Sequence, residues 1–472
     1  MCIRDRYNPG TGKAGDISIH TERLNITAGT EISTPTFFTG QGGNISLTST
    51  EFISIEGSEN LAPFATGIFA NTLYGSGQGG NLQLTTNRLD MTTNTAIQVG
   101  TFWGTGHAGD ARIEAQTMQL QDASFITTTG QFGNGGNAGN LEVIADSIYI
   151  SGSEGSSDPF GSGFTGMSTM AGPWGGEGGQ LKITATDNLT LTNRSQIGTG
   201  SAGPGPGGDT EIITGLLEVN NGANIQSIAK GSGDAGNIQI VANQVRVSGV
   251  HPDPFFNDIT GEANLAPSAI TTQTLDQGGR AGDVMITADA IEVTDGAVID
   301  ARTFGPGDGG NIHFNAESVS IGGENADMRE FLASQGKSPF VARSRVQTNA
   351  ESLLLGDDAD GNAGDIFIDA TELNLFDKGF INSETTGPGT GGDITLVTDR
   401  MTISGDARVL AVSAVSPNAG RAGNISISER DTFENDNGIV SSAALVAAGG
   451  DVSIEAGAIY LRNEAFVSAR NL

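Results

Sequence analysis

One short phrase recurs along the chain and constrains its fold more than any other feature. The phrase is a small residue, a glycine, then Asn, Asp or Gln, followed by a short, mostly apolar alternation such as ISI or LQL. It occurs fourteen times. The glycine at its second position, called the phrase glycine below, is residue 15, 43, 80, 109, 139, 179, 208, 236, 282, 310, 364, 392, 423 or 450. Most intervals are 27 to 31 residues, and four are longer, at 37, 40, 46 and 54. Such periodicity is typical of repeat architectures, in which each unit packs on its neighbours.

Each interval contains three short stretches in which apolar and polar residues alternate, which indicates half-buried strands. The first follows the glycine, as in Ile17 and Ile19, and the second comes a few residues later, as in Leu24 and Ile26. The third has one central apolar residue, with a small or β-branched residue two positions on. These central residues are Ile32, Ile68, Ile97, Ile126, Met167, Ile197, Ile225, Ile270, Ile299, Val346, Ile381, Val409, Ile439 and Val467.

The pattern predicts an all-β fold. Strands this short cannot bury their apolar faces alone, so each must pair with its copy in the next repeat. Parallel pairing needs a long crossover, which the other two strands of the repeat supply. We therefore predict a right-handed parallel β-helix, or solenoid, of about fourteen coils of three short strands. The residues expected to stack almost fully buried inside it include Ile97, Ile126, Ile197, Ile225, Ile299 and Ile381.

The four long intervals all carry their extra residues between the second and third strands. The predicted inserts span about 56–66, 151–165, 248–267 and 322–343, so they should emerge from one lateral edge. A helical turn is expected only in the last of them, around Met328 to Ala333. The inserts contain aromatic residues and prolines that the coils largely lack, and the candidate recognition residues are Pro63, Phe64, Pro159, Phe160, Phe255, Phe256, Pro339 and Phe340.

Two interpretations of these aromatic inserts stand. Loops on a rigid scaffold usually carry recognition, and exposed aromatic rings can stack on sugars or enter protein grooves. Alternatively, the Phe side chains only pack the inserts onto the coils. We expect no other surface feature of the chain to be both irregular and aromatic.

Composition excludes several classes of function. The net charge of −31 opposes binding to nucleic acids and to anionic membranes, and suits a self-repelling extracellular surface. No apolar run is long enough to span a membrane as a helix, so no membrane insertion is expected. Cys2 is the single cysteine, so no intrachain disulfide can form.

Residues 1–6 match nothing downstream and are interpreted as a non-native leader, whereas 12–472 should form one continuous β-helix. Because the repeat pattern continues to the last residue, Leu472, we expect the chain to be an internal fragment of a longer protein.

The repeats resemble a known family. Units of the type AGNIxI followed by LxLxxGAxIxTxTxGxG, interrupted by IxIxG…P-F inserts, are similar to large cyanobacterial proteins of the filamentous-haemagglutinin type. Residues 281–310 and 138–179 carry the resemblance, which covers nearly the whole chain after Gly12. It implies a right-handed β-helical shaft, secretion by a two-partner system, and a role in adhesion or surface coating. The target to be tested is a glycan or another cell-surface component. The outer-membrane transporter would recognise an amino-terminal domain that this chain lacks.

Recurrent glycines and acidic residues have simpler interpretations than a ligand site. Gly-x-Gly-x-x-Gly, as at Gly203, Gly205 and Gly208, recurs in many repeats and opens a strand instead of a helix. We interpret these glycines as coil corners that need a positive φ. The residue after the phrase glycine is Asp seven times, Asn six times and Gln once. It predicts a ladder that bonds to backbone amides, or else one in which Ca²⁺ neutralises neighbouring carboxylates. The four histidines are too far apart in register to form a metal site. No cofactor is predicted.

A carbohydrate-active β-helix, either a polysaccharide lyase or a glycoside hydrolase, is the alternative function. Such enzymes place acids and bases on one outer face, and charged residues do occur on or near successive third strands. By register, Arg302, Asn349 and Glu384 should stack, but most outward ladders are surface ion pairs, and a glycosidase needs paired carboxylates in a cleft. We therefore predict no catalysis. The residues concerned are Asp300, Arg302, Arg343, Arg345 and Glu384.

Overall fold

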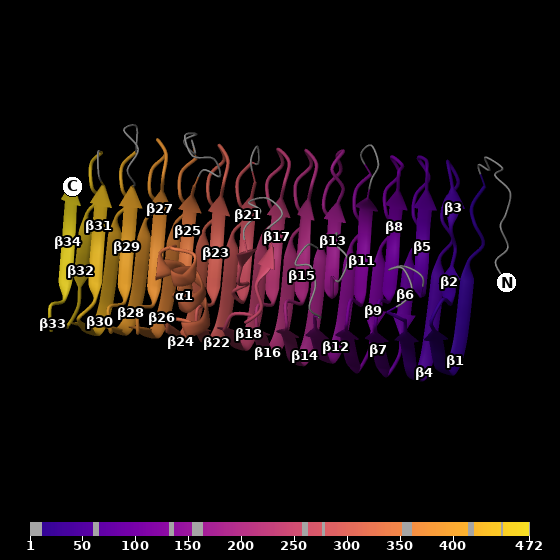
Figure 1. The fold of residues 1–472 in the computed structure, drawn as a ribbon, viewed down its shortest axis with the longest axis horizontal. Coiled ribbons are helices and arrows are strands. Elements are labelled where there is room, and N and C mark those ends of the chain that lie inside the picture. The colour runs from indigo at the N-terminus through magenta and orange to yellow at the C-terminus, as the bar shows by residue number, and fades with distance from the viewer. Residues whose placement is uncertain are drawn as a thin grey trace.

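The computed structural model is an elongated all-β structure built on two long parallel sheets (Figure 1). Together these sheets form the body of the molecule, called the shaft below. The α-helix and the 3₁₀ helix among the described residues both lie in the last insert. The structure describes residues 12–59, 66–131, 136–152, 164–256, 263–275, 279–351, 361–413, 420–444 and 447–471.

The larger sheet has seventeen strands and contains the first and second predicted strands of each repeat. In most repeats these two join into one strand, in which the alternation of buried residues breaks once, as between Ala145 and Ile148 of β12. This break explains why the sequence suggested two strands. The strands are β1 Ile17–Thr27, β4 Ile45–Glu56, β6 Leu82–Thr85, β7 Arg88–Thr92, β9 Ala111–Glu114, β10 Thr117–Gln121, β12 Leu141–Ser151, β14 Leu181–Thr192, β16 Thr210–Asn220, β18 Ile238–Ser248, β22 Val284–Thr294, β24 Ile312–Gly322, β26 Ile366–Phe376, β28 Ile394–Ser404, β30 Ile425–Asp436, β32 Val452–Glu455 and β33 Ala458–Arg462.

The second sheet contains the third strand of each repeat, with the short β3 paired beside β5. Each strand pairs with its counterpart one repeat further on, so that Ile197, Ile225 and Ile270 are consecutive partners. The six isoleucines predicted to stack inside are all 0% exposed, which confirms the predicted interior. The strands are β2 Glu31–Ser33, β3 Thr36–Phe37, β5 Gly67–Leu73, β8 Ala96–Phe102, β11 Phe125–Gln131, β13 Gly166–Ala171, β15 Gln196–Ser201, β17 Asn224–Ala229, β21 Ala269–Thr274, β23 Val298–Thr303, β25 Arg345–Ala350, β27 Phe380–Thr385, β29 Arg408–Ser413, β31 Ile439–Ala444 and β34 Phe466–Asn471.

One interior residue was predicted wrongly. In β31 the partner of Val409 is Val440, which is fully buried, whereas Ile439 is only half-buried. Five positions separate the preceding interior residue Asn435 from Val440, one fewer than separate Ile403 from Val409. The turn is therefore one residue shorter than in the repeat before it. Ile439 and Val440 are both β-branched, so composition alone could not choose between the two registers.

The phrase glycines are required for a different reason from the one predicted. Their φ values are not positive in the described repeats, so the interpretation as positive-φ corners is wrong. Instead, successive repeats approach each other too closely here for a side chain. A Cβ on Gly236 would lie 2.0 Å from the carbonyl oxygen of Gly208, and the same contact is 1.8–2.2 Å at each phrase glycine from Gly43 to Gly450. The backbones therefore stack directly on one another at this corner.

Glu429 is an acidic residue inside the shaft, at the bend of β30. It pairs in register with Thr398, and the corresponding residues in earlier repeats are Ala370 and Ala316. The Thr398 hydroxyl donates a hydrogen bond to one carboxylate oxygen of Glu429. The other oxygen has no hydrogen-bond partner among the described residues. Burial, with Asp399 nearby, raises the pKa of this carboxyl to about 7, although the Thr398 hydrogen bond opposes the rise.

Glu429 should make stability fall as the pH rises. Between pH 4.5 and about 7 the unfolded chain releases this proton while the folded chain keeps it, so the folded state binds more protons. Glu429→Gln should therefore leave stability near that of the unmodified chain at pH 4 and raise it by about 1–3 kcal/mol at pH 8. Urea unfolding at the two pH values measures this difference. An equal change at both pH values would contradict the raised pKa.

Candidate functional site

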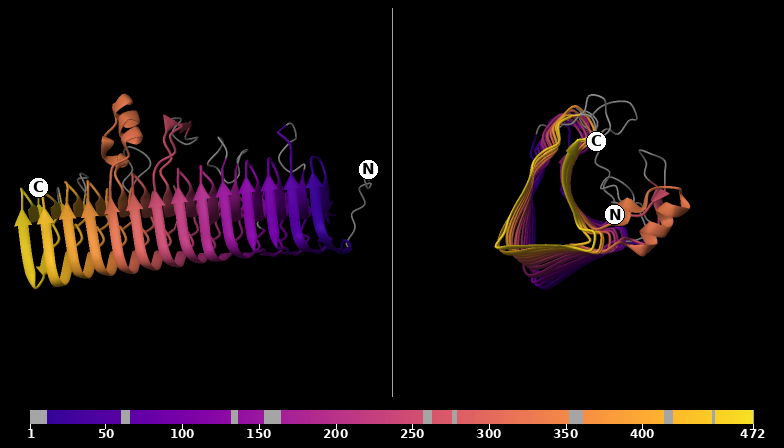
Figure 2. Two further views of the ribbon diagram at one scale, coloured as in Figure 1. Left: turned by 90° about the horizontal axis from the view of Figure 1, so that it is seen from below. Right: turned by 90° about the vertical axis from the view of Figure 1, so that its left-hand side faces the viewer.

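The inserts with described residues project from one lateral edge of the shaft, as predicted. Figure 2 shows α1 and the β19–β20 hairpin on the same side of the molecule. The hairpin pairs Phe255–Phe256 with Ala263–Asn264 in antiparallel fashion, and α1 spans Ala326–Ser334. The predicted helical turn is therefore confirmed. It begins at Asn325, whose side chain accepts a hydrogen bond from the Met328 backbone N–H.

All four inserts return to the shaft through the same contact. The residue that ends each insert is a serine or threonine, and its hydroxyl oxygen accepts a hydrogen bond from a backbone N–H in the turn of the preceding repeat. The pairs are Thr66 with Gly29, Thr165 with Ala123, Ser268 with Gly222 and Ser344 with Gly296, at 2.9–3.0 Å. This bond fixes the base of each insert, whatever the length of the loop above it.

The third and fourth inserts pack against each other and form one unit, called the insert pair below. Its apolar cluster contains Val250 and Leu265 from one insert, and Met328, Leu332 and Ala342 from the other. The cluster covers the turn of the intervening repeat. A Cβ on Gly296 in that turn would lie 2.8 Å from the Cβ of Asn325 and 3.0 Å from the carbonyl oxygen of Ala342.

Of the eight predicted recognition residues, Pro63, Phe64, Pro159 and Phe160 lie outside the described residues. For Phe255 and Phe256 the structure gives the backbone pairing of β19. Pro339 and Phe340 begin the 3₁₀ helix η1, Pro339–Ala342.

Phe340 illustrates how an insert contacts the shaft. Its ring meets that of Phe380 edge-on, with centroids 4.7 Å apart, and the Arg343 guanidinium lies 5.0 Å from its centroid. Phe380 is fully buried, so this contact holds the insert against the second sheet. Pro339 and Val341 on either side remain exposed. The packing interpretation therefore describes the Phe340 ring, and Pro339 remains available at the surface.

The structure brings together most of the charged residues that the sequence singled out. Arg302, Asn349 and Glu384 are consecutive partners, as predicted. Asp300 is fully buried, and its Oδ2 lies 2.8 Å from Arg302 Nε and accepts a hydrogen bond from Gln347. Burial raises the pKa of the Asp300 carboxyl, although the neighbouring guanidinium groups oppose the rise.

Three further members of the set differ in their surroundings. The buried Arg345 donates to the carbonyl oxygen of Val341 at 2.7 Å, and burial lowers its pKa to about 10. Burial also raises the pKa of Glu384, whose carboxylate accepts a hydrogen bond from Asn382. Arg343 is not part of the ladder; it lies at the base of the fourth insert, with Nη2 3.6 Å from an oxygen of Asp406. Each carboxylate is thus held by neighbouring side chains of the same face.

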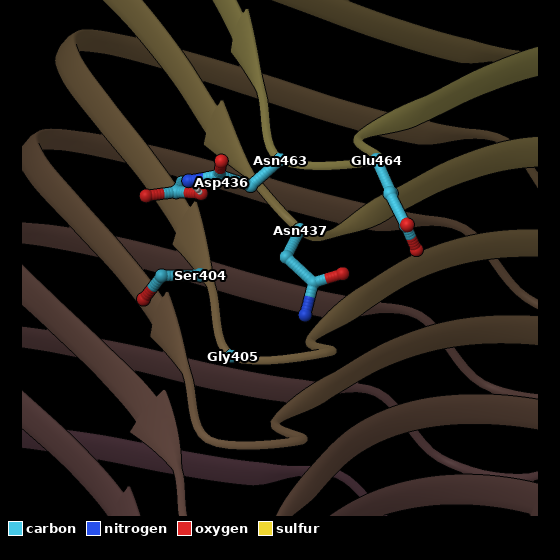
Figure 3. A pocket seen from close by; sticks show the side chains of 6 residues that line it. All are labelled: Ser404, Gly405, Asp436, Asn437, Asn463 and Glu464. Atoms are coloured by element: carbon cyan, nitrogen blue, oxygen red, sulfur yellow. Dashed lines mark hydrogen bonds between the residues drawn. The ribbon is translucent and has the colours of Figure 1, made fainter.

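A shallow hollow of about 520 Å³ lies on the lateral edge near β33. Figure 3 shows its lining side chains on successive turns, which come from Ser404, Gly405, Asp436, Asn437, Asn463 and Glu464. Asn463 donates a 2.7 Å hydrogen bond to Asp436. The hollow is an open depression between neighbouring turns and contains no converging set of reactive groups.

The predicted Asn and Asp ladder is present and bonds to backbone amides. Along it, the Oδ1 atom of one repeat accepts a hydrogen bond of 2.7–3.0 Å from the corresponding backbone N–H of the next, from Asp16 to Gln180 and again from Asp209 to Asp451. This geometry matches the first interpretation of the ladder. In the described part of the chain, no group of three or more His, Cys, Asp or Glu residues is arranged to hold a metal ion.

Sequence reasoning missed a second aromatic surface, at the glycine-rich corner that follows the third strands. The exposed residues there are Phe37, Tyr74, Trp103 and Trp174, of which Tyr74 and Trp103 stack on each other and follow the paired residues Leu73 and Phe102. The expectation that the inserts are the sole irregular aromatic feature is therefore wrong. An available signal was the aromatic residue directly before a glycine in LYGSG and FWGTG, and one residue before it in FFTG. It was overlooked because each aromatic reads as the last residue of a strand.

No family model, curated protein or solved structure matches the chain. Among the described residues, no helix has the length and apolar character needed to cross a membrane.

Proposed function

We propose that the chain is a right-handed parallel β-helix that serves as the structural and adhesive shaft of a large secreted surface protein of the filamentous-haemagglutinin type. The observation that carries this proposal is the register of the second sheet, whose third strands pair repeat by repeat from β2 to β34. One apolar cluster fills the shaft along this length. Crossovers between parallel strands of one sheet are right-handed in about 98% of cases, which gives the proposed hand.

A rod of this kind is suited to holding loops away from a surface. Thirteen steps between repeats of about 4.8 Å give an axis of roughly 60 Å. Each repeat contacts its neighbours through backbone hydrogen bonds and stacked side chains, so the rod resists bending without a large globular core. The charge of −31 keeps neighbouring rods apart and soluble.

Export and location follow from the sequence resemblance. In this proposal the protein is extracellular, an outer-membrane two-partner transporter exports it, and its target is a glycan or another component of a cell surface. The four inserts share the same contact at their base, a hydroxyl that accepts a backbone hydrogen bond, although their lengths differ. This shared base supports a shaft that holds loops out toward a binding partner.

We propose a non-catalytic role for the charged ladder. The Asp300 carboxyl group is fully buried against Arg302 and Gln347, which suits a structural contact whose partners cannot be removed singly without leaving an unpaired buried charge. A carbohydrate-active β-helix would instead use these acids on a substrate. Incubation with a panel of polysaccharides separates the two functions, because new reducing or unsaturated ends would establish catalysis and remove the proposed role.

Replacing all four inserts should leave the shaft folded and remove its adhesion through the inserts. The uninterrupted repeat connects β22 to β23 through Asp295, Gly296 and Ala297, so two residues followed by the serine or threonine at the base of each insert can close the turn. We expect a chain with Asp-Gly in place of 57–65, 152–164, 249–267 and 323–343 to keep its strand circular dichroism. Binding to intact cells, measured by co-sedimentation, should fall to background.

The matched control is a chain in which only the last two inserts are replaced. It removes the insert pair as a unit and leaves the first two loops, so partial binding would assign adhesion to both halves. A shaft without inserts that still binds cells fully would contradict the proposed role of the inserts. Loss of strand signal would contradict the independent shaft.

A further inference from the structure

The insert pair contacts repeats that are not neighbours along the shaft. Counted by the phrase glycines, the third insert belongs to the eighth repeat, after Gly236, and the fourth insert to the tenth, after Gly310. In a protein of stacked repeats each unit contacts the units directly before and after it, so stability is a sum of nearest-neighbour terms. The insert pair departs from this rule in three places: toward the sixth repeat, between the eighth and the tenth, and toward the twelfth.

The contact toward the sixth repeat is made by Arg194. This residue lies in the turn between β14 and β15, and its Nη2 donates a hydrogen bond to the backbone carbonyl oxygen of Asp253 in the third insert. Arg194 is buried although it is charged, so the insert holds it away from solvent. The insert also covers the turn of the seventh repeat, where a Cβ on Gly222 would lie 2.7 Å from the Cβ of His251. The third insert therefore reaches back over two repeats.

The contact between the eighth and tenth repeats is the apolar cluster of the insert pair. Its five buried side chains come from both inserts and lie against the turn of the ninth repeat. There, Val250 Cγ2 would be 3.1 Å from a Cβ placed on Gly296. Asn325, which begins α1, donates a hydrogen bond of 3.2 Å to Asp295 in the same turn. Separation of the eighth repeat from the tenth would therefore expose this apolar surface, in addition to breaking the contacts between neighbouring repeats.

The contacts toward the eleventh and twelfth repeats use charged side chains of the fourth insert. An oxygen of Glu324, whose side chain is nearly buried, lies 2.6 Å from Lys378 Nζ in the turn of the eleventh repeat. Arg343 Nη2 lies 3.6 Å from an oxygen of Asp406 in the turn of the twelfth. Removal of one partner from such a pair leaves a poorly solvated charge behind, so the pairs oppose detachment of the insert.

We propose that the insert pair is a brace that fastens the sixth to the twelfth repeats together against separation. Every boundary between these repeats is crossed by one of the three contacts, so the shaft opens there only if a contact of the brace breaks as well as the backbone ladder. Such a brace suits a shaft that carries load between its two ends. The inference goes beyond adhesion, because it depends on how the inserts contact the shaft and not on whether they bind a target.

Hydrogen exchange followed by mass spectrometry of peptides tests the brace boundary by boundary. The double variant Met328→Ser, Leu332→Ser should disrupt the apolar cluster while the chain keeps its strand circular dichroism. Amides of β22 and β23, in the ninth repeat, should then exchange about tenfold faster or more, because local opening no longer has to break the cluster. Amides of β4 and β5, in the second repeat, should exchange as before. Glu330→Ala changes an exposed residue of α1 and is the matched control, with no expected effect.

Two single variants test the outer contacts without touching the apolar cluster. Arg194→Met removes the donor to Asp253 and should speed exchange in β16 and β17 of the seventh repeat by about threefold or more. Asp406→Asn, which keeps a residue type that tolerates its φ of 60°, should do the same in β26 and β27 of the eleventh. These two variants decide the question if the double variant fails to fold.

Two results would overturn the brace. Exchange in the shaft strands that is unchanged in all variants would show that the inserts are attached to the shaft without restraining it. Equal acceleration in every strand, β4 and β5 included, would show general destabilisation instead of contacts that act at particular boundaries. Neither result depends on cell binding, so the brace and the adhesive role of the inserts can fail separately.

Discussion

The Ile225→Asp variant should lose at least about 3–5 kcal/mol of stability, because it places an unpaired carboxylate inside the shaft. Ile225 is 0% exposed and stacks between Ile197 and Ile270, so the new carboxylate would lie among apolar side chains and away from the surface. Repeat proteins unfold in segments, so the loss should be greatest in β15, β17 and β21. Hydrogen exchange of their amides and urea unfolding measure the local and the total effect.

Two variants serve as controls, one for the change of side-chain size and one for the added charge. Ile225→Val keeps the stacked β-branched side chain and should cost only about 0.5–1.5 kcal/mol. Gln239→Asp adds the same carboxylate to the exposed face of β18 and should change stability little. An unfolding curve of Ile225→Asp that matches that of Gln239→Asp would show that Ile225 does not face the interior.

Gly236→Ala should be the second most damaging single change, at about 2–3 kcal/mol or more. The new Cβ would lie 2.0 Å from the Gly208 carbonyl oxygen, where hydrogen bonds to the repeats on both sides restrict backbone movement. The loss reflects a steric clash between repeats and not a change of φ preference, so it should also appear at equivalent glycines. Thermal unfolding followed by circular dichroism measures it.

Gly15→Ala is the matched control for this prediction. Gly15 occupies the same place in the first phrase, but a Cβ there meets nothing within 4 Å. The substitution should therefore leave the melting temperature nearly unchanged. If both alanine variants were tolerated equally, the close approach of neighbouring repeats would not be what demands glycine.

The register of the repeats could be predicted from the sequence because it is a local pattern copied many times. Alternation with period two decides which face of each strand is buried, and a fixed interval makes each residue the neighbour of its own copy. Hence the stacking of Ile225 and the succession of Arg302, Asn349 and Glu384 were predictable. The pattern failed at Val440, where a shorter turn and two adjacent β-branched residues made both registers acceptable.

Only the tertiary structure decided what the irregular residues contact. Nothing in the repeat pairs Val250 with Met328, or Phe340 with Phe380, because these contacts join segments whose sequences share no period. The same holds for the glycine requirement, which arises from the distance between two backbones and not from the conformation of one. Tyr74 and Trp103 read as ends of buried strands, yet the turn that follows directs them into solvent. Periodicity therefore determined the shaft, and contacts between non-equivalent residues determined the surfaces available for binding.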